Sequence, residues 1–207
     1  MADFHIEPFC GGLFQTNGYL FRCGDKNWLF DAPEGAADWL LEKGVTLDGL
    51  ILTHQHHDHV IGAGKIVEAF RCPIWAYSDP SGDLTMAKRL ETMIGMPCDL
   101  DPYQIDHLLE GVTDINLPEL SVTILHVPGH SPDSLCFLIE GHPLLVGGDV
   151  LFNGGIGRTD FPHGDHDLLI SGIKEKLWQL ADETQVLPGH GPTTTIGIEK
   201  ATNPFLQ

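Results

Sequence analysis

The sequence predicts an α+β fold of two packed β-sheets covered by helices on their outer faces. Short apolar runs rich in β-forming residues alternate with segments of helical period, and this alternation occurs in both halves of the 207-residue chain. A composition of 42% hydrophobic and 19% charged residues is typical of a globular chain, and no low-complexity linker or short repeat interrupts it. Because a sheet must bury its apolar face against another layer, two β-rich halves predict two packed sheets.

The first half begins with a predicted β-hairpin over residues 19–32, in which "YLFRC" and "WLFDA" flank the turn "GDKN". "ADWLLEKG" predicts a short helix over 37–44 that ends at a glycine. "LDGLILT" at 47–53 is typical of a buried strand, and "IGAGKIVEAF" at 61–70 of the helix that follows it. "CPIWAY" predicts another strand, and residues 83–95 another helix.

The second half repeats this alternation. "LSVTILHV", "SLCFLIE" and "PLLVGGD" predict strands at 120–127, 134–140 and 143–149, with a turn at Gly141, His142 and Pro143. Residues 165–182 predict an amphipathic helix with apolar positions 168, 169, 173, 177 and 180 and an acidic first turn. "TQVLPGH" at 184–190 predicts a late strand.

Charge and cysteine usage limit the function classes. Eleven Lys and Arg against 29 Asp and Glu give a net charge of −18, which disfavours nucleic acid and anionic membranes as partners. Five cysteines without a C-x-x-C pair predict reduced thiols, and the opening residues lack the basic and apolar regions of an export signal. No apolar run reaches the roughly 18 residues that a membrane span needs. We therefore expect a soluble, cytoplasmic protein.

The segment "THQHHDH" holds an unusual density of metal-ligating groups directly after a predicted strand. His54, His56, Asp58 and His59 have the spacing H-x-H-x-D-H. In an extended segment, positions i, i+2 and i+4 project to one side, and a turn at 57–59 returns the last imidazole toward them. Burying four such groups is costly without a metal or other partners, so the motif predicts a metal site.

Three later residues are candidates for the remaining ligands. His130, Asp149 and His190 each follow a predicted strand directly or through Pro-Gly, among glycines and prolines that permit sharp turns. Strand ends that converge on one rim are where open sheets place ligands.

These motifs resemble those of the metallo-β-lactamase superfamily over essentially the whole chain. "GGIGRTDFPHGD" and "LPGHGPTTTIGIEKATNPFLQ" are similar to segments of its short glyoxalase II-like hydrolases. The resemblance implies a four-layer αββα sandwich with two mixed sheets, formed by residues 1–207 as a single domain. Almost nothing follows "NPFLQ", so we expect no C-terminal helical glutathione-binding domain.

The resemblance also implies a ligand set for two metal ions. One ion would be held by His54, His56 and His130, and the other by Asp58, His59 and His190, with Asp149 bridging both. His57 is not a ligand in this pattern. The imidazole and carboxylate set suits Zn²⁺, with Fe or Mn²⁺ as alternatives. Two such ions can share a hydroxide that attacks a carbonyl, and Asp58 could orient the attacking water and take its proton.

Glyoxalase II cleaves the thioester of hydroxyacylglutathione, so the resemblance implies a thioesterase for small-molecule thioesters. Arg158 is the candidate that would bind a substrate carboxylate, and Phe152 and Asn153 are candidates for the same wall. The alternative for Arg158 is an ion pair with Asp160 or Asp165 that shapes the loop.

Other functions stay open from the sequence. "GRTDF" also occurs in persulfide dioxygenases, which hold one iron by two His and one Asp. A lactonase would share the two-metal set. The charge disfavours a tRNA nuclease, and the missing export signal disfavours a β-lactamase. A metal-stabilised binding module is the non-enzymatic alternative.

Overall fold

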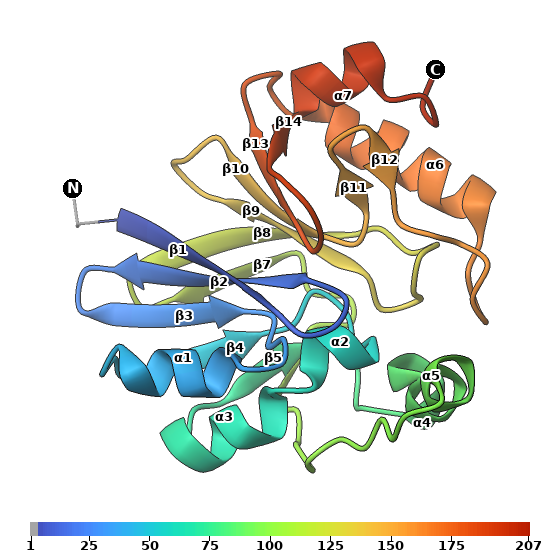
Figure 1. Ribbon diagram of the computed structural model, residues 1–207. Coiled ribbons are helices and arrows are strands. Elements are labelled where there is room, and N and C mark those ends of the chain that lie inside the picture. Colours follow the sequence, from blue (N-terminus) through green and yellow to red (C-terminus); the bar gives the residue numbers. More distant parts are fainter. Residues whose placement is uncertain (1–3) are drawn as a thin grey trace. The chain divides into compact units, whose positions relative to one another are not determined.

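The computed structural model of the protein describes residues 4–207, and the chain folds into two compact units (Figure 1). The first unit extends to Glu110, and the second comprises Gly111–Gln207. Each unit contains one six-stranded mixed sheet with helices, which confirms the expected α+β class. Residues 1–3 of the expected domain lie outside the described residues.

The sheet of the first unit has the strand order β1-β2-β3-β4-β5-β6. Its strands are β1 (Phe4–Gly11), β2 (Thr16–Cys23), β3 (Lys26–Phe30), β4 (Gly49–Ile51), β5 (Ile74–Ala76) and β6 (His107–Leu108). The first three strands pair antiparallel, and β3 to β6 pair in parallel. The antiparallel pairing of β2 with β3 confirms the predicted hairpin, whereas β1 and β6 were not predicted.

The helices of the first unit are α1 (Ala36–Glu42), α2 (His57–Val60), α3 (Ala63–Phe70), α4 (Gly82–Thr85) and α5 (Ala87–Ile94). Two predictions need correction. The single helix expected over 83–95 is two helices, because Met86 between them has a left-handed backbone with φ 51°. The segment from His54 to Asp58 is not extended throughout, since α2 begins at His57.

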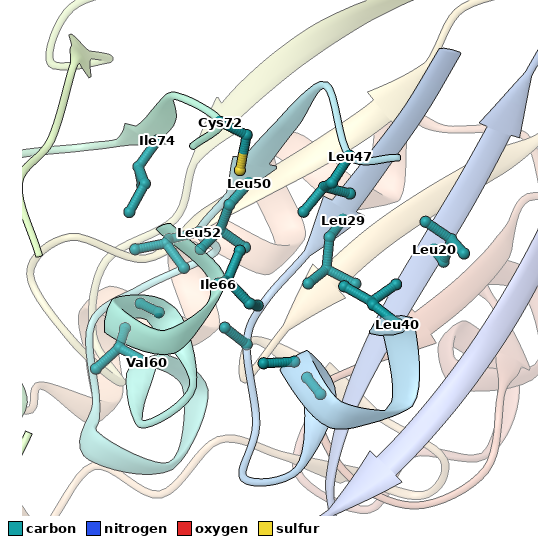
Figure 2. Close-up of a cluster of buried hydrophobic side chains, with 14 of the residues drawn as sticks. Leu20, Leu29, Leu40, Leu47, Leu50, Leu52, Val60, Ile66, Cys72 and Ile74 are labelled. Carbon is teal, nitrogen blue, oxygen red and sulfur yellow. The ribbon is translucent and has the colours of Figure 1, made fainter. Parts of the chain in front are cut away.

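A hydrophobic core joins α1 and α3 to one face of this sheet (Figure 2). Leu20, Leu29 and Leu50 come from three neighbouring strands, and Leu40 of α1 and Ile66 of α3 pack against them. All five side chains are fully buried. Each such burial stabilises the fold by roughly 1.5–3 kcal/mol. The core thereby fixes the end of β4, after which the histidine motif begins.

The sheet of the second unit has the order β14-β13-β10-β9-β8-β7. Its strands are β7 (Asp114–Leu117), β8 (Leu120–His126), β9 (Leu135–Ile139), β10 (Leu144–Gly148), β13 (Gln185–Pro188) and β14 (Thr194–Thr195). Only the β10–β13 pair is parallel. The strands predicted at 120–127, 134–140, 143–149 and 184–190 are confirmed. A separate two-stranded sheet contains β11 (Leu151–Phe152) and β12 (Gly155–Ile156).

Two helices and a 3₁₀ turn complete the second unit: α6 (His166–Lys176), η1 (Leu177–Gln179) and α7 (Ile196–Thr202). The side chain of Asp165 accepts a hydrogen bond from the Leu168 amide and caps α6, as the acidic start predicted. Leu169 and Ile173 are fully buried in the core, whereas Leu168, expected on the same apolar stripe, is 45% exposed. Within residues 4–207, no helix is long and apolar enough to cross a membrane.

Candidate metal-binding residues

Four of the predicted ligands gather after β4 in the first unit, and we call them the first ligand set. They are His54, His56, Asp58 and His59. The three histidines are buried. The ring of His54 lies with its centroid 4.6 Å from that of His56 and 4.1 Å from that of His59. The turn expected at 57–59 is the single helical turn of α2, and it brings His59 back to His54.

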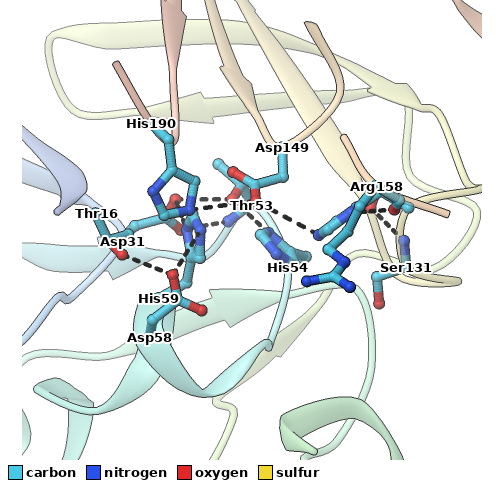
Figure 3. A network of polar contacts seen from close by, with 12 residues as sticks. Thr16, Asp31, Thr53, His54, Asp58, His59, Ser131, Asp149, Arg158 and His190 are labelled. Carbon is cyan, nitrogen blue, oxygen red and sulfur yellow. Dashed lines mark hydrogen bonds and ion pairs between the residues drawn. The ribbon is translucent and has the colours of Figure 1, made fainter. Parts of the chain in front are cut away.

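A buried carboxylate orients two imidazoles of this set (Figure 3). Asp31 Oδ2 lies 2.8 Å from His59 Nδ1 and 2.7 Å from the Thr53 hydroxyl. Since Thr53 donates its only hydroxyl proton to Asp31, its Oγ1 can accept from His54 Nδ1 at 3.1 Å. Both Nδ1 atoms then carry the proton, which leaves Nε2 of each ring as the ligating nitrogen.

Asp58 is held from β2. The Thr16 hydroxyl donates a 2.6 Å hydrogen bond to Asp58 Oδ2, which lies 3.7 Å from His59 Nε2. The side chain of Asp58 is 21% exposed, more than the imidazoles. Its carboxylate is therefore fixed beside His59 while it stays accessible to a water molecule.

The remaining predicted ligands gather in the second unit, and we call them the second ligand set. Asp149 Oδ2 lies 3.5 Å from His130 Nε2 and 3.3 Å from His190 Nε2. The parallel pairing of β10 with β13 explains part of this geometry, because Gly148 faces Pro188 and the Gly189 amide donates to the Gly148 carbonyl. Carboxyl ends of parallel strands lie at one sheet edge, so Asp149 and His190 follow their strands to the same place.

A third imidazole is oriented by the backbone. His130 Nδ1 donates to the Arg158 carbonyl at 2.8 Å, which again leaves Nε2 to ligate. The neighbouring Gly157 permits this contact, since a Cβ there would lie 1.9 Å from the Asp149 carbonyl oxygen and 3.0 Å from His130 Cβ. No larger residue fits at this position without moving the backbone.

Both sets fit a divalent transition metal by their donor chemistry. They offer imidazole nitrogen and carboxylate oxygen, and three rings present Nε2 because their Nδ1 atoms bind oxygen atoms of the protein. The five cysteines form no disulfide and lie elsewhere in sequence, at Cys10, Cys23, Cys72, Cys98 and Cys136. Such a donor set is typical of catalytic centres.

The three predicted substrate residues lie on the chain that follows Asp149. The Phe152 ring centroid is 6.1 Å from that of His190, in an edge-on contact. Asn153 donates its side-chain amide to the Thr193 carbonyl. Arg158 makes two 2.7 Å hydrogen bonds with Asp160 and lies 3.8 Å above the Phe161 ring. These contacts favour the loop-shaping alternative for Arg158, and its role in substrate binding stays a prediction.

Sequence reasoning missed the residues that hold the ligands. Asp31, Thr53 and Thr16 lie at strand ends beside buried polar groups. Asp31 and Thr53 each follow an apolar strand, which is a weak signal. Asp31 and Thr53 come into contact only when β3 pairs with β4, so this contact could not be predicted from the sequence.

Comparisons with known proteins identify the family. The model of the metallo-beta-lactamase superfamily matches residues 11–190, which include all seven predicted ligands. The chain belongs to the metallo-beta-lactamase superfamily. Hydroxyacylglutathione hydrolase GloC of Haemophilus influenzae is 38% identical over 208 residues, which cover 98% of this chain and 98% of that protein.

Two solved structures of the superfamily are also similar. The B3 metallo-beta-lactamase BLEG-1 has a TM-score of 0.86 and 33% identity, covering 98% of this chain and 99% of that one. TTHA1623 in a di-iron-bound form has a TM-score of 0.82 and 33% identity, covering 97% and 100%. The metallo-β-lactamase fold expected from the sequence is confirmed, and the chain is a hydrolase-like enzyme of this superfamily. One of these relatives is named a hydroxyacylglutathione hydrolase and another a metallo-beta-lactamase, so membership of the family does not fix the substrate.

Proposed function

We propose that this protein is a dinuclear-metal hydrolase that cleaves thioesters of the S-acylglutathione type. The observation that carries the proposal is the 38% identity to a hydroxyacylglutathione hydrolase across 98% of both chains. The oriented imidazoles of the two ligand sets support it, because they present nitrogen atoms for metal without a thiolate.

The proposed centre combines the two ligand sets as the family resemblance implies. His54, His56 and His130 would hold one ion and Asp58, His59 and His190 the other, with Asp149 as a ligand shared by both. The distances of Asp149 Oδ2 to His130 and His190 support the bridging role, since one oxygen is near the ligands assigned to different ions. When bound, two such ions would lower the pKa of a bound water toward neutrality and polarise a carbonyl.

Asp58 is the proposed catalytic carboxylate. Thr16 fixes its position, and its partial exposure allows it to orient the attacking water and accept its proton. Asp31 acts on the same reaction at a distance by holding His59, and through Thr53 it also holds His54.

The metal and the compartment belong to the proposal as well. Zn²⁺ fits imidazole and carboxylate donors, and the di-iron form of TTHA1623 supports iron as the alternative. Five cysteines without a disulfide support our proposal that the protein functions in the reducing cytoplasm. The net charge of −18 supports a small-molecule substrate rather than nucleic acid or a membrane. We also propose that Phe152, Asn153 and Arg158 line the substrate-binding site.

A thiol-release assay tests the proposal. Metal-free protein is reloaded, its metal content is measured, and it is incubated with a hydroxyacylglutathione while free thiol is followed. We expect catalytic thiol release with two metal equivalents and none without metal. Absence of thiol release in fully loaded protein would contradict a thioesterase. Oxygen consumption with a persulfide would identify a dioxygenase, and opening of a β-lactam would identify a lactamase.

A further inference from the structure

A cavity of about 140 Å³ lies within the first unit beside Asp58, and we call it the α5 pocket. Its lining includes Thr16 and Asp58, together with Leu90 and Ile94 of α5. Ile61 also lines it. The cavity therefore joins a proposed catalytic carboxylate to the apolar side of a helix.

Helix α5 does not pack this apolar side into the core. None of its residues is fully buried, although Leu90 and Ile94 are one turn apart on one face. Three large hydrophobic residues at the pocket are exposed: Leu13 at 69%, Phe14 at 41% and Met96 at 59%. An exposed apolar cluster beside a polar site is typical of a ligand-binding surface.

The charges around the α5 pocket select the kind of ligand. Glu34 and Asp58 contribute carboxylates, and its described lining residues include no lysine or arginine. Because Asp58 is a proposed metal ligand, Glu34 is the carboxylate whose charge would remain. An anionic group such as a glutathione carboxylate would meet Glu34 here with no lysine or arginine to pair with, whereas an uncharged apolar group would meet no such repulsion.

We propose that the α5 pocket holds an uncharged apolar acyl group of the thioester substrate. This inference rests on the proposed function and specifies its substrate: acyl chains of about four to six carbons rather than a small hydroxylated acyl group. The volume supports this size, since a cavity of about 150 Å³ lined by apolar side chains accommodates benzene. The thiol part of the substrate, which carries carboxylates in glutathione, lies outside the pocket.

Binding can be measured without catalysis by NMR of methyl-labelled methionine. Met96 lines the pocket, whereas Met93 on α5 is 54% exposed and does not. Hexanamide, an uncharged acyl mimic, should shift the Met96 methyl signal saturably and leave the Met93 signal in place. Ile94→Ala should weaken this binding about tenfold, and Met93→Ala should not change it.

Substrate preference is measured on the fully metal-loaded protein with acetyl, butyryl, hexanoyl and octanoyl thioesters of glutathione. We expect kcat/KM to rise about fourfold for each added methylene group up to six carbons and then to level off. Ile94→Ala should reduce kcat/KM for the hexanoyl thioester about tenfold and leave the acetyl thioester unchanged. Met93→Ala is the matched control and should leave all four values unchanged.

A Met96 signal that hexanamide does not shift would overturn the proposal. So would a kcat/KM independent of acyl length, or an equal effect of Ile94→Ala on every thioester. A Met96 signal that changes with protein dilution in the absence of hexanamide would assign the surface to a second copy of the chain instead. Hexanamide binding without any thioester hydrolysis would refute the proposed thioesterase and the acyl assignment, while the apolar ligand site itself would stand.

Discussion

The carboxylate oxygen Oδ2 of Asp31 lies 2.8 Å from Nδ1 of His59, and both side chains are buried. Because a carboxylate only accepts hydrogen bonds, the proton is on Nδ1, and Nε2 is left with its lone pair for a metal. Thr53 donates its hydroxyl proton to Asp31 and therefore accepts a hydrogen bond from His54 Nδ1, which fixes His54 in the same tautomer. Asp31, which is not itself a predicted ligand, thus sets the tautomer of His54 and His59, the first and last histidines of the motif.

We expect Asp31→Asn to weaken metal binding about 10–100-fold, because it removes the negative charge that orients and polarises His59. Competition with a chromophoric chelator measures the affinity. Asp48→Asn is the control, since Asp48 is a carboxylate of the same unit that binds Lys26 and the Asn27 amide instead. Equal affinities of the Asp31 variant and the unmutated protein would refute the orienting role.

Asp58→Asn should lower kcat by about 10²–10⁴-fold with the fold intact, because the amide cannot accept the proton of the attacking water. The variant keeps the shape of the side chain, and its Oδ1 can still accept from Thr16. Steady-state kinetics on metal-analysed protein, with thermal unfolding as the control for folding, gives the result. A fully loaded variant with near-normal kcat would exclude this role.

Arg158→Ala separates the two roles of its guanidinium. If Arg158 binds a substrate carboxylate, kcat/KM for acylglutathiones should fall roughly 10–150-fold through KM, and thioesters without a carboxylate should be barely affected. If it only shapes the loop through Asp160, both substrates should slow alike and the melting temperature should fall. Asp160→Asn is informative as a control because it removes the ion pair and keeps the guanidinium.

We expect the buried thiol of Cys136 to make the folded protein less stable at alkaline pH. Its thiol is fully buried, and burial raises its pKa to about 12 from an ordinary value of 9.0. Above pH 9 the unfolded chain releases this proton while the folded chain keeps it, so the free energy of unfolding falls as pH rises toward 12. One thiol contributes a slope of up to about 1.4 kcal/mol per pH unit.

Urea unfolding at pH 8 and pH 10.5 measures this slope. Cys136→Ala should make it shallower than in the unmutated protein. An identical slope in the unmutated protein and the Cys136 variant would show that other groups cause the alkaline loss.

The sequence could predict the elements whose periodicity comes from burial. The helical period of α6 and the two apolar runs of β2 and β3 on either side of a Gly/Asp/Asn turn are visible in the sequence itself. Strand β1 was not predicted because its alternation is broken at Glu7 and Pro8, which leaves two short stretches on either side. Helix α2 is a single turn, too short for a periodic signal, and its start at His57 depends on how β4 ends.

The ligands were predictable because several rare residue types recur at fixed spacing, but their supports were not. Asp31 contacts Thr53 and His59 over separations of 22 and 28 residues, which only the pairing of β3 with β4 creates. The α5 pocket could not be predicted either, since its lining residues come from segments as far apart in the sequence as Gly11 and Cys98.

Activity as a function of added metal tests the central claim most directly. Metal-free protein is titrated with Zn²⁺ under tight-binding conditions, and the initial rate of thiol release from an acylglutathione is measured at each ratio. We expect the rate to reach its plateau at two equivalents per chain and Asp149→Ala to impair both steps of loading. A plateau at one equivalent, with no second ion bound, would contradict a dinuclear hydrolase.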